Sequence, residues 1–189
     1  MRSIPIRLLA LTLVAPVGIY ALASIPSRVA TTTERRDPVY AGMVGQWSGT
    51  VEVRDQCDST RRVKRSTRVR VSALPEFDAL EMQFTTREEA GQVVNDTDRL
   101  QLDKALTAAR WGGVDGLEIQ HYAVTVADSL MATSPFRLVL ERERGGEDIP
   151  ATIRETLTIA PGEIRIVQER RMYGGEFEFQ REYVLKRVG

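Results

Sequence analysis

The 189-residue sequence contains few of the side chains that most often hold metals and cofactors, with one cysteine and one histidine. A single cysteine rules out a disulfide within the chain and argues against a thiolate-rich zinc or iron–sulfur site. The one histidine, His121, rules out multi-histidine metal sites and a haem held by two histidines. The sequence therefore predicts neither a bound metal nor a cofactor.

An excess of charge of either sign is also missing. The chain has 26 basic and 26 acidic side chains, which gives a formal net charge of zero. A general nucleic-acid binder needs a strong cationic surplus to displace counterions from phosphates, so no nucleic-acid partner is expected. With 42% hydrophobic and 28% charged residues, the composition is ordinary for a globular protein and excludes general disorder.

The one long apolar run lies at the amino terminus. Residues 1–7 carry two arginines and no acid, residues 8–23 are almost entirely apolar, and Ala21 and Ala23 supply the small residues of a cleavage site. We therefore expect a signal peptide over residues 1–23 and export to the periplasm or the outside of the cell. A retained amino-terminal anchor is the alternative, although the run is shorter than the ~20 residues of a membrane span.

In an exported protein Cys57 is a lone thiol. The sequence does not decide between an inert loop residue and a link to another chain. It also leaves open the oligomeric state of the protein.

Residues 24–40 are expected to be a flexible lead-in, because Thr31–Pro38 shows no apolar periodicity. Residues 41–189 form the expected folded domain. From Trp47 onward, short runs alternate between apolar and polar residues and are separated by turn residues. These runs predict ten strands: Trp47–Arg54, Val63–Val71, Phe77–Thr86, Val93–Asp103, Ala105–Trp111, Leu117–Val126, Phe136–Arg144, Ile153–Ile159, Ile164–Met172 and Phe177–Arg187.

The connections between these strands are too short for parallel crossovers, so neighbouring strands are expected to be antiparallel. Closing such a meander into a barrel removes both edge strands. The predicted fold is all-β, an up-and-down antiparallel barrel of about ten strands. A sandwich of two five-stranded sheets would use the same alternation and is the alternative.

Gly45-Gln46-Trp47, at the start of the first strand, resembles the Gly-x-Trp signature of the calycins, which are the lipocalins and fatty-acid-binding proteins. Over residues 41–188 the chain is similar to lipocalin-like families of uncharacterised bacterial exported proteins. The resemblance implies that Trp47 closes the barrel floor beneath a basic residue of the last strand, for which Arg181, Lys186 and Arg187 are the candidates. One departure is that Asp55–Arg62 is too short for the helical lid of fatty-acid-binding proteins.

The period of two also indicates which polar side chains point into the barrel. If Phe177, Phe179 and Leu185 face inward, Arg181 and Tyr183 share that face. Arg181-x-Tyr183 resembles the Arg-x-Tyr pair with which fatty-acid-binding proteins hold a ligand carboxylate. A β-bulge would reverse these faces.

The same counting places other polar side chains inside. Buried charges are costly unless they are paired or in contact with water, so such residues indicate a compensating partner or a wet pocket. The inward set from this counting is Glu155 with Ile153 and Leu157, His121 with Leu117 and Ile119, and Gln168 and Arg170 with Ile164 and Ile166.

These residues predict a small-molecule-binding barrel whose lumen holds an amphipathic, anionic ligand. The expected ligand contacts are polar residues and one tryptophan: Arg181, Tyr183, Arg170, Glu155, His121 and Trp47. The ligand's apolar body would contact Leu80, Met82, Phe84, Phe177 and Phe179.

A purely structural role for the same residues is the competing interpretation. In it, Arg181 stacks on Trp47 and Glu155 pairs with Arg170. A barrel enzyme, in which Glu155 or His121 acts as general acid or base, is the alternative function, and no catalytic residue is otherwise indicated.

A basic stripe is the densest charge feature, formed by the outward positions Arg62, Lys64, Arg68 and Arg70. It could contact anionic lipid or an acidic protein, which gives a third hypothesis of a structural or protein-binding barrel. Alternatively it is a solvated strand whose charge is offset by acids such as Glu52. Membrane contact is expected only through this stripe or the signal segment.

Overall fold

The computed structural model describes residues 36–55, 57–88, 91–114, 119–127, 136–144 and 150–189. The expected signal peptide and most of the lead-in lie outside these residues. The described elements are a helix, a short 3-10 turn (Pro75–Phe77) and ten strands. In chain order, the helix and strands are α1 (Arg36–Met43), β1 (Gly45–Arg54), β2 (Arg62–Leu74), β3 (Ala79–Arg87), β4 (Val93–Leu102), β5 (Ala108–Gly113), β6 (Gln120–Val126), β7 (Phe136–Arg144), β8 (Ala151–Ala160), β9 (Glu163–Met172) and β10 (Phe177–Arg187).

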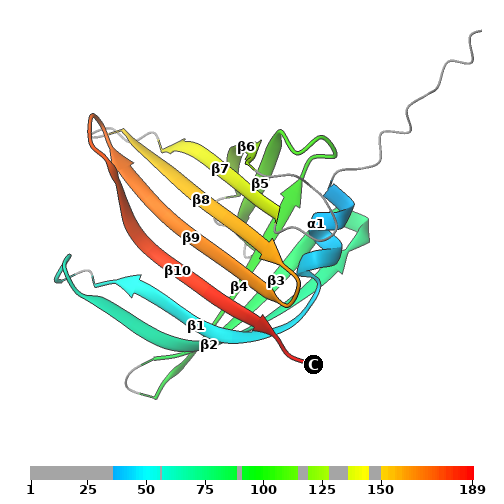
Figure 1. The fold of residues 1–189 in the computed structure, drawn as a ribbon, viewed down its shortest axis with the longest axis horizontal. Helices are drawn as coiled ribbons and strands as arrows, with labels where there is room; N and C mark the ends of the chain where they lie inside the picture. Colours follow the sequence, from blue (N-terminus) through cyan, green and yellow to red (C-terminus); the bar gives the residue numbers. More distant parts are fainter. Residues whose placement is uncertain (1–35, 56, 89–90, 115–118, 128–135, 145–149) are drawn as a thin grey trace, which may run out of the picture. The chain divides into compact units, whose positions relative to one another are not determined.

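The strands form a closed antiparallel barrel in up-and-down order, as Figure 1 shows. Each strand pairs with the next, and β10 returns to β1, from Trp47 opposite Arg187 to Val53 opposite Arg181. The predicted all-β barrel is confirmed, and the alternative of two separate sheets is wrong because the β1–β10 seam leaves no open edge.

The closing seam depends on Gly49, which lies opposite Leu185. A Cβ atom on Gly49 would lie 1.9 Å from the carbonyl oxygen of Val184. Only glycine allows β1 and β10 to approach this closely.

Helix α1 covers the end of the barrel at which β1 begins (Figure 1). Its residues Val39 and Met43 are buried in the main apolar cluster. The Nε1–H of Trp47 donates to the carbonyl oxygen of Met43 at 2.8 Å. The first part of α1 falls within residues 24–40, which the sequence assigned to the lead-in, and its helical structure was not predicted.

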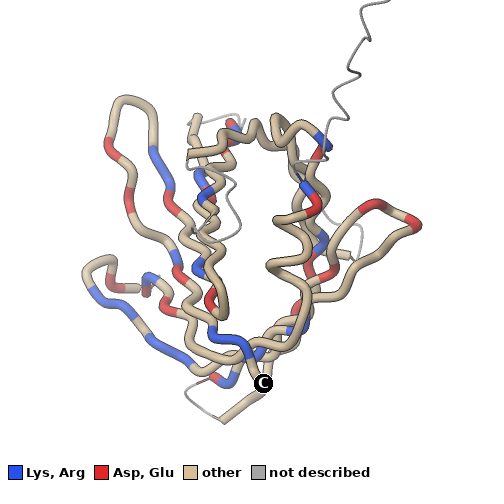
Figure 2. The backbone as a smooth tube through the Cα atoms, turned by 45° about the vertical axis from the view of Figure 1, so that its right-hand side comes forward, with Lys and Arg blue, Asp and Glu red and all other residues tan. Residues whose placement is uncertain are grey.

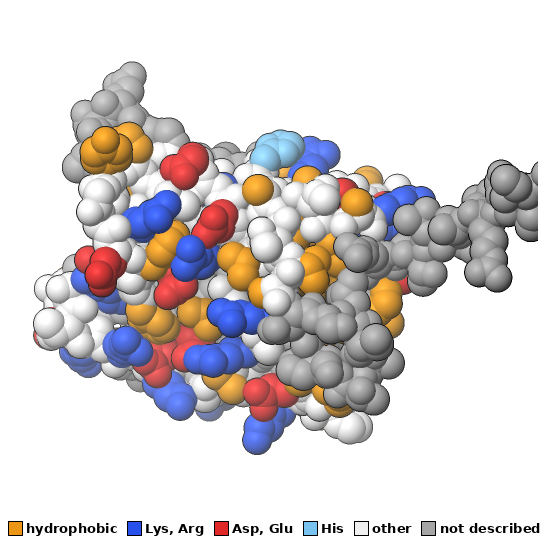
Figure 3. All heavy atoms as spheres, turned by 45° about the horizontal axis from the view of Figure 1, so that its top comes forward, with side chains coloured by type: hydrophobic (Ala, Val, Ile, Leu, Met, Phe, Trp, Pro, Cys, Tyr) orange, Lys and Arg blue, Asp and Glu red, His pale blue; other side chains and the backbone are white. Residues whose placement is uncertain are grey.

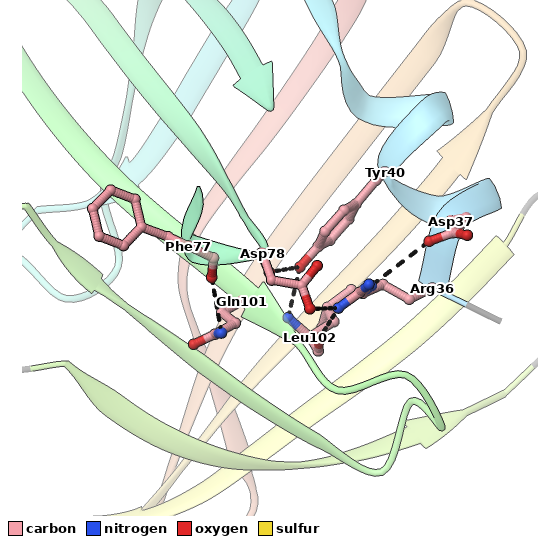
Figure 4. A network of polar contacts seen from close by, with 7 residues as sticks. All are labelled: Arg36, Asp37, Tyr40, Phe77, Asp78, Gln101 and Leu102. Atoms are coloured by element: carbon pink, nitrogen blue, oxygen red, sulfur yellow. Dashed lines mark hydrogen bonds and ion pairs between the residues drawn. The ribbon is translucent and has the colours of Figure 1, made fainter. Parts of the chain in front are cut away.

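A polar network ties α1 to the barrel (Figure 4). Arg36, which is buried, pairs with Asp78, a residue in left-handed conformation that ends the 3-10 turn. The hydroxyl of Tyr40 accepts from the backbone N–H of Leu102 at 2.8 Å and donates to the carbonyl oxygen of Asp78 at 3.2 Å. The helix is thus held to the 3-10 turn that precedes β3 and to β4.

Two strand starts differ from the sequence prediction for local reasons. The run expected at Ala105–Trp111 begins instead at Ala108, because the Asp103 carboxylate accepts from the backbone N–H groups of Thr107 and Ala108 and closes a turn. Likewise β3 begins after the turn at Pro75–Phe77 rather than at Phe77.

The interior of the barrel divides into an apolar half and a polar half. Near α1, side chains such as Leu157, Ile166 and Leu185 are buried in one apolar cluster. Further from α1 along the same strands, the inward positions become polar. Glu155 on β8 lies opposite Gln168 on β9, and Gln168 lies opposite Arg181 on β10.

Phe177 and Phe179 were expected to face inward, and this prediction is wrong because β10 contains a β-bulge. Phe179 lies opposite Glu169 and Arg181 opposite Gln168, so Gln180 is an extra residue in β10. Phe179 therefore faces outward, where the guanidinium of Arg62 lies 4.1 Å from its ring centroid.

Phe177 faces outward as well. The guanidinium of Arg154, from the outer face of β8, lies 3.6 Å from the Phe177 ring centroid. Neither phenylalanine lines the lumen. The inward positions of Arg181 and Tyr183 follow from Leu185 alone.

Candidate functional site

The polar half of the lumen centres on Glu155, whose side chain is only 2% exposed. Its Oε1 atom accepts a hydrogen bond from Nε2 of Gln168 and lies 3.7 Å from Nη2 of Arg181. The Oε2 atom is buried and has no hydrogen-bond partner among the described residues. Both donors therefore serve one oxygen of the carboxyl group and leave the other unsatisfied.

The surroundings of Glu155 shift its protonation equilibrium. Burial raises the pKa of the Glu155 carboxyl from 4.5 to about 7, although Arg181 and the Gln168 hydrogen bond act in the opposite direction. Desolvation wins because an ionised carboxylate loses most of its hydration in this position. Near neutral pH, Glu155 is therefore poised between its charged and neutral forms.

Arg181 is the cation of this pair. Burial is the largest influence on the pKa of its guanidinium and lowers it, but Glu155, Tyr183, Asp98 and Tyr122 together raise this pKa above its ordinary value, so Arg181 remains charged. The side chain is 34% exposed, although its Nε atom is buried and has no partner within the described part of the chain. The guanidinium is therefore anchored in the barrel and still reached by solvent.

Tyr183 shares the inward face of β10 with Arg181, as the sequence predicts. Its ring centroid lies 5.8 Å from Cζ of Arg181 and 5.1 Å from the ring centroid of Phe84 on β3. Burial raises the pKa of its hydroxyl, so Tyr183 is a neutral donor. The Arg181–Tyr183 pair thus lies where polar and apolar lining meet.

Arg170 also lies inside, opposite Ile153 on β8 and Glu178 on β10. Its Nε atom is buried without a hydrogen-bond partner in the described ranges. The structure pairs Glu155 with Arg181 rather than with Arg170, so the Glu155–Arg170 pair of the competing structural interpretation is wrong.

Two further charged residues of the lumen were missed by the sequence reasoning. Asp98 on β4 accepts from Nε1 of Trp111 at 3.0 Å, and burial raises the pKa of its carboxyl. Arg142 on β7 donates through Nε to the Tyr122 hydroxyl at 3.2 Å. Counting back from Leu100 and Leu102 would have found Asp98, and counting on from Leu138 and Leu140 would have found Arg142.

Trp47 lies at the floor of the barrel, where the calycin resemblance places it. The basic residue over its ring is Arg187, with Cζ 4.5 Å from the ring centroid. The Arg187 guanidinium also donates to the carbonyl oxygens of Val44 and Gly42, each at 3.0 Å. The stacking of Arg181 on Trp47, which the competing structural interpretation requires, is therefore wrong, and Arg181 lies on the interior face instead.

His121 does not belong to the lumen. Tyr122 and Val124 are the buried residues of β6. His121 precedes Tyr122 in the strand, faces the opposite side and is exposed. The pale-blue imidazole lies at the surface in Figure 3, on a face where basic and acidic side chains are mixed. The count from Leu117 and Ile119 was wrong because Ile119 precedes the strand and is exposed.

On β3, Leu80, Met82 and Phe84 are buried inside the barrel, as their shared face predicts, and their contact with a ligand stays a prediction. Of the six residues expected to contact a ligand, the structure brings together Arg181, Tyr183 and Glu155, with Arg170 on the same interior face. Trp47 lies apart at the floor, and His121 lies outside.

The basic stripe is on the outer face of β2, as predicted, and its blue positions follow one another in Figure 2. Arg62 pairs with Glu52 at 3.2 Å, which confirms part of the expected charge compensation. A hollow of about 530 Å³ on this side is lined partly by Ser48, Ser66 and Arg68. Cys57 is exposed and unpaired in the adjoining loop.

Within the described ranges, no group of three or more histidine, cysteine, aspartate and glutamate side chains could hold a metal ion. No helix in those ranges has the length and hydropathy needed to span a bilayer.

Comparison with known proteins adds little to this geometry. No family model matches the chain, and no curated protein matches it by sequence. Among solved structures, the chain is similar to Rv2717c from M. tuberculosis, with 12% identity, a TM-score of 0.49, and coverage of 80% of this chain and 96% of that chain. This likeness assigns neither a family nor a function.

Proposed function

We propose that the protein is an exported barrel that binds one small amphipathic anion in its lumen. The observation that carries the proposal is the set of buried, unpartnered polar atoms on the interior face: Glu155 Oε2, Arg181 Nε and Arg170 Nε. Native interiors rarely leave such groups unsatisfied, and they cluster where a ligand or ordered solvent completes them.

The division of the lumen matches an amphipathic molecule. An alkyl or aromatic body would pack against Met82, Phe84 and Ile166 in the apolar half. The polar head would then lie level with Glu155 and Arg181. Ligand pockets commonly combine a mostly apolar lining with a few polar groups that fix orientation.

The charge of the polar half favours an anionic head. Three arginines, Arg142, Arg170 and Arg181, face two acids, Asp98 and Glu155. Burial raises the pKa of both carboxyl groups, and that of Glu155 reaches about 7, so Glu155 carries less than a full negative charge near neutral pH. A planar guanidinium such as that of Arg181 can bind a carboxylate through two hydrogen bonds, and Tyr183 can add a third.

Membership of a lipocalin-like family is part of the proposal. It is supported by Gly45-Gln46-Trp47 at the start of β1 and by Trp47 lying under Arg187 of the last strand. Export rests on the amino-terminal sequence, and cleavage after Ala23 would give a mature protein that starts at Ser24. The intact mass of protein from the exported fraction tests this.

Titration calorimetry with dodecanoate tests the binding function. We expect one site per barrel near pH 6, and at least about tenfold weaker binding by Arg181→Met, since charge-assisted hydrogen bonds to the head are lost. Arg165→Met, on the outer face of β9 where Arg165 pairs with Glu182, is the matched control and should bind normally. Equal binding by Arg181→Met and wild type would refute the lumenal site.

A barrel enzyme is the second candidate, because the buried Glu155 has a pKa of about 7 and is thus suited to general acid–base work. His121 no longer supports this candidate, since it lies outside the barrel. Under the enzyme hypothesis Glu155→Gln abolishes turnover of a bound carboxylate but not its binding. Native mass spectrometry of wild type and variant, each incubated with the ligand co-purified from the exported fraction, distinguishes the two functions by whether the ligand mass changes.

A further inference from the structure

The hydrogen bonds around the Glu155 carboxyl group favour protonation of one of its two oxygens, Oε2. Gln168 and Arg181 both approach Oε1, so that oxygen is already an acceptor. The other oxygen, Oε2, is buried and meets no donor from any described residue. A neutral Glu155 therefore carries its proton on Oε2 and presents an O–H donor inside the barrel, level with Arg181.

We propose that a protonated Glu155 forms part of the anion site, so that the ligand's anionic head and one proton bind to the lumen together. The inference rests on the proposed function and deepens it. The ligand class becomes an amphipathic anion that accepts hydrogen bonds from both Arg181 and the Glu155 O–H, and the proton comes from solvent. No covalent bond other than the O–H bond is formed.

Electrostatics requires this coupling if the head group binds beside Arg181. An ionised Glu155 would place two negative charges within a few ångströms in a poorly solvated space, which is strongly unfavourable. Protonation removes the repulsion and adds a donor. It also weakens the hold of Glu155 on Arg181, so the guanidinium can turn its charge toward the ligand.

The ionisable groups around Glu155 favour the same proton. Arg181, Arg142 and Asp98 act on the charge of its carboxyl group. Tyr122 on β6 and Tyr183 on β10 also interact with it, and Arg170 lies on the neighbouring strand β9, opposite Ile153. Without ligand the pKa of Glu155 is about 7. An anion bound beside the carboxyl group raises this pKa further, so Glu155 takes up a proton at neutral to alkaline pH. Asp98 is the second acid and already accepts from Trp111.

The test uses two probes, dodecanoate and decanesulfonate, in titration calorimetry between about pH 6 and about pH 9. Decanesulfonate stays ionised throughout, so a proton taken up with it must bind to the protein. We expect both affinities to fall by up to about tenfold per pH unit above the pKa of Glu155. Measurements in buffers of different ionisation enthalpy should show uptake approaching one proton per ligand at the alkaline end.

Glu155→Gln is the decisive variant, because its amide keeps a donor where the Oε2 proton would be but does not titrate. It should bind both probes with little pH dependence and no proton uptake. Asp98→Asn is the matched control and should retain the uptake. Uptake that persists in Glu155→Gln, or uptake with dodecanoate alone, overturns the inference.

Two outcomes separate the inference from the function on which it rests. If neither probe binds at any pH, the proposed function fails. If both bind but wild type shows no pH dependence and no uptake, only the proton coupling fails. Should Glu155→Gln not fold, the ¹³C shift of the Glu155 carboxyl in labelled wild type reports the same proton, and a signal that stays ionised with ligand bound at about pH 7 overturns the inference.

Discussion

Inside the barrel, Glu155 and Arg181 form an ion pair whose desolvation is unfavourable for folding and whose polar atoms are suited to bind a ligand. The carboxyl is buried with one oxygen unsatisfied, and the guanidinium is held beside it at 3.7 Å rather than at close contact. Such a pair contributes little to folding stability because desolvation offsets much of the attraction. The proposed binding function accounts for the presence of this pair inside the barrel.

The raised pKa of Glu155 predicts a specific dependence of stability on pH. The folded pKa, about 7, lies above the ordinary 4.5, so the folded state binds the proton more tightly than the unfolded chain. The contribution of Glu155 protonation to the free energy of unfolding is therefore complete below about pH 4.5. It is lost as the pH rises through 7, and the total loss is ~3 kcal/mol. Urea unfolding of wild type and Glu155→Gln at several pH values measures the difference.

Glu155→Gln should lack this decline, because the amide does not ionise. Glu169→Gln, on the outer face of β9, is the control and should follow wild type. Parallel pH profiles of wild type and Glu155→Gln would show that Glu155 does not titrate with a raised pKa.

Alternation along single strands predicted Glu155, Arg181 and Tyr183 correctly as inward residues. Glu155 lies in a regular strand, and Arg181 and Tyr183 lie in the regular part of β10 between the bulge and Leu185. The same logic failed for His121, since Ile119 lies before β6 and the true inward phase is set by Tyr122. Asp98 was missed because its strand reads as polar along most of its length. Its inward position follows from the two buried leucines at the end of the strand, Leu100 and Leu102.

At the scale of single elements, α1 holds the floor of the barrel through a few directed hydrogen bonds. We expect Tyr40→Phe to destabilise the protein by ~1–2 kcal/mol, because the backbone N–H of Leu102 loses its acceptor. The free energy of unfolding and the hydrogen exchange of the Leu102 amide measure this. Tyr173→Phe, at an exposed turn residue, is the control and should change neither.

The seam between β1 and β10 is a second element with a sharp requirement. Gly49→Ala would bring Cβ to 1.9 Å from the Val184 carbonyl oxygen, so the strands must separate. We expect a loss of about 3 kcal/mol of stability in thermal or urea unfolding. Gly175→Ala, whose Cβ would come no closer than 3.4 Å to the Met172 carbonyl oxygen, should be nearly neutral. Equal stability of the two variants would show that the seam can relax.

The bulge at Gln180 shows what a strand pattern cannot supply. Phe177, Phe179, Arg181 and Tyr183 read as one continuous alternation, yet the extra residue places the two phenylalanines outside. On the outer face the two rings contact arginines of other strands, Arg62 of β2 and Arg154 of β8. Helix α1 was missed for a related reason, because it is short and is stabilised by contacts with the barrel rather than by its own sequence.

For the whole molecule, ten short strands with tight connections were enough to predict the closed barrel. The position of the polar half could not be read from any one strand, since it arises where β8, β9 and β10 become polar at the same level. That arrangement gives the lumen an apolar end near α1 and a charged end away from it. An amphipathic anion would bind with its head toward the charged end.

A crystal structure of the protein with dodecanoate tests this arrangement most directly. The predicted result places the carboxylate within hydrogen-bond distance of Arg181 and of Glu155 Oε2, with the alkyl chain against Phe84 and Met82. Dodecanoate on the outer face instead, such as in the hollow lined by Ser48, Ser66 and Arg68, would contradict lumenal binding and shift the function to the basic stripe.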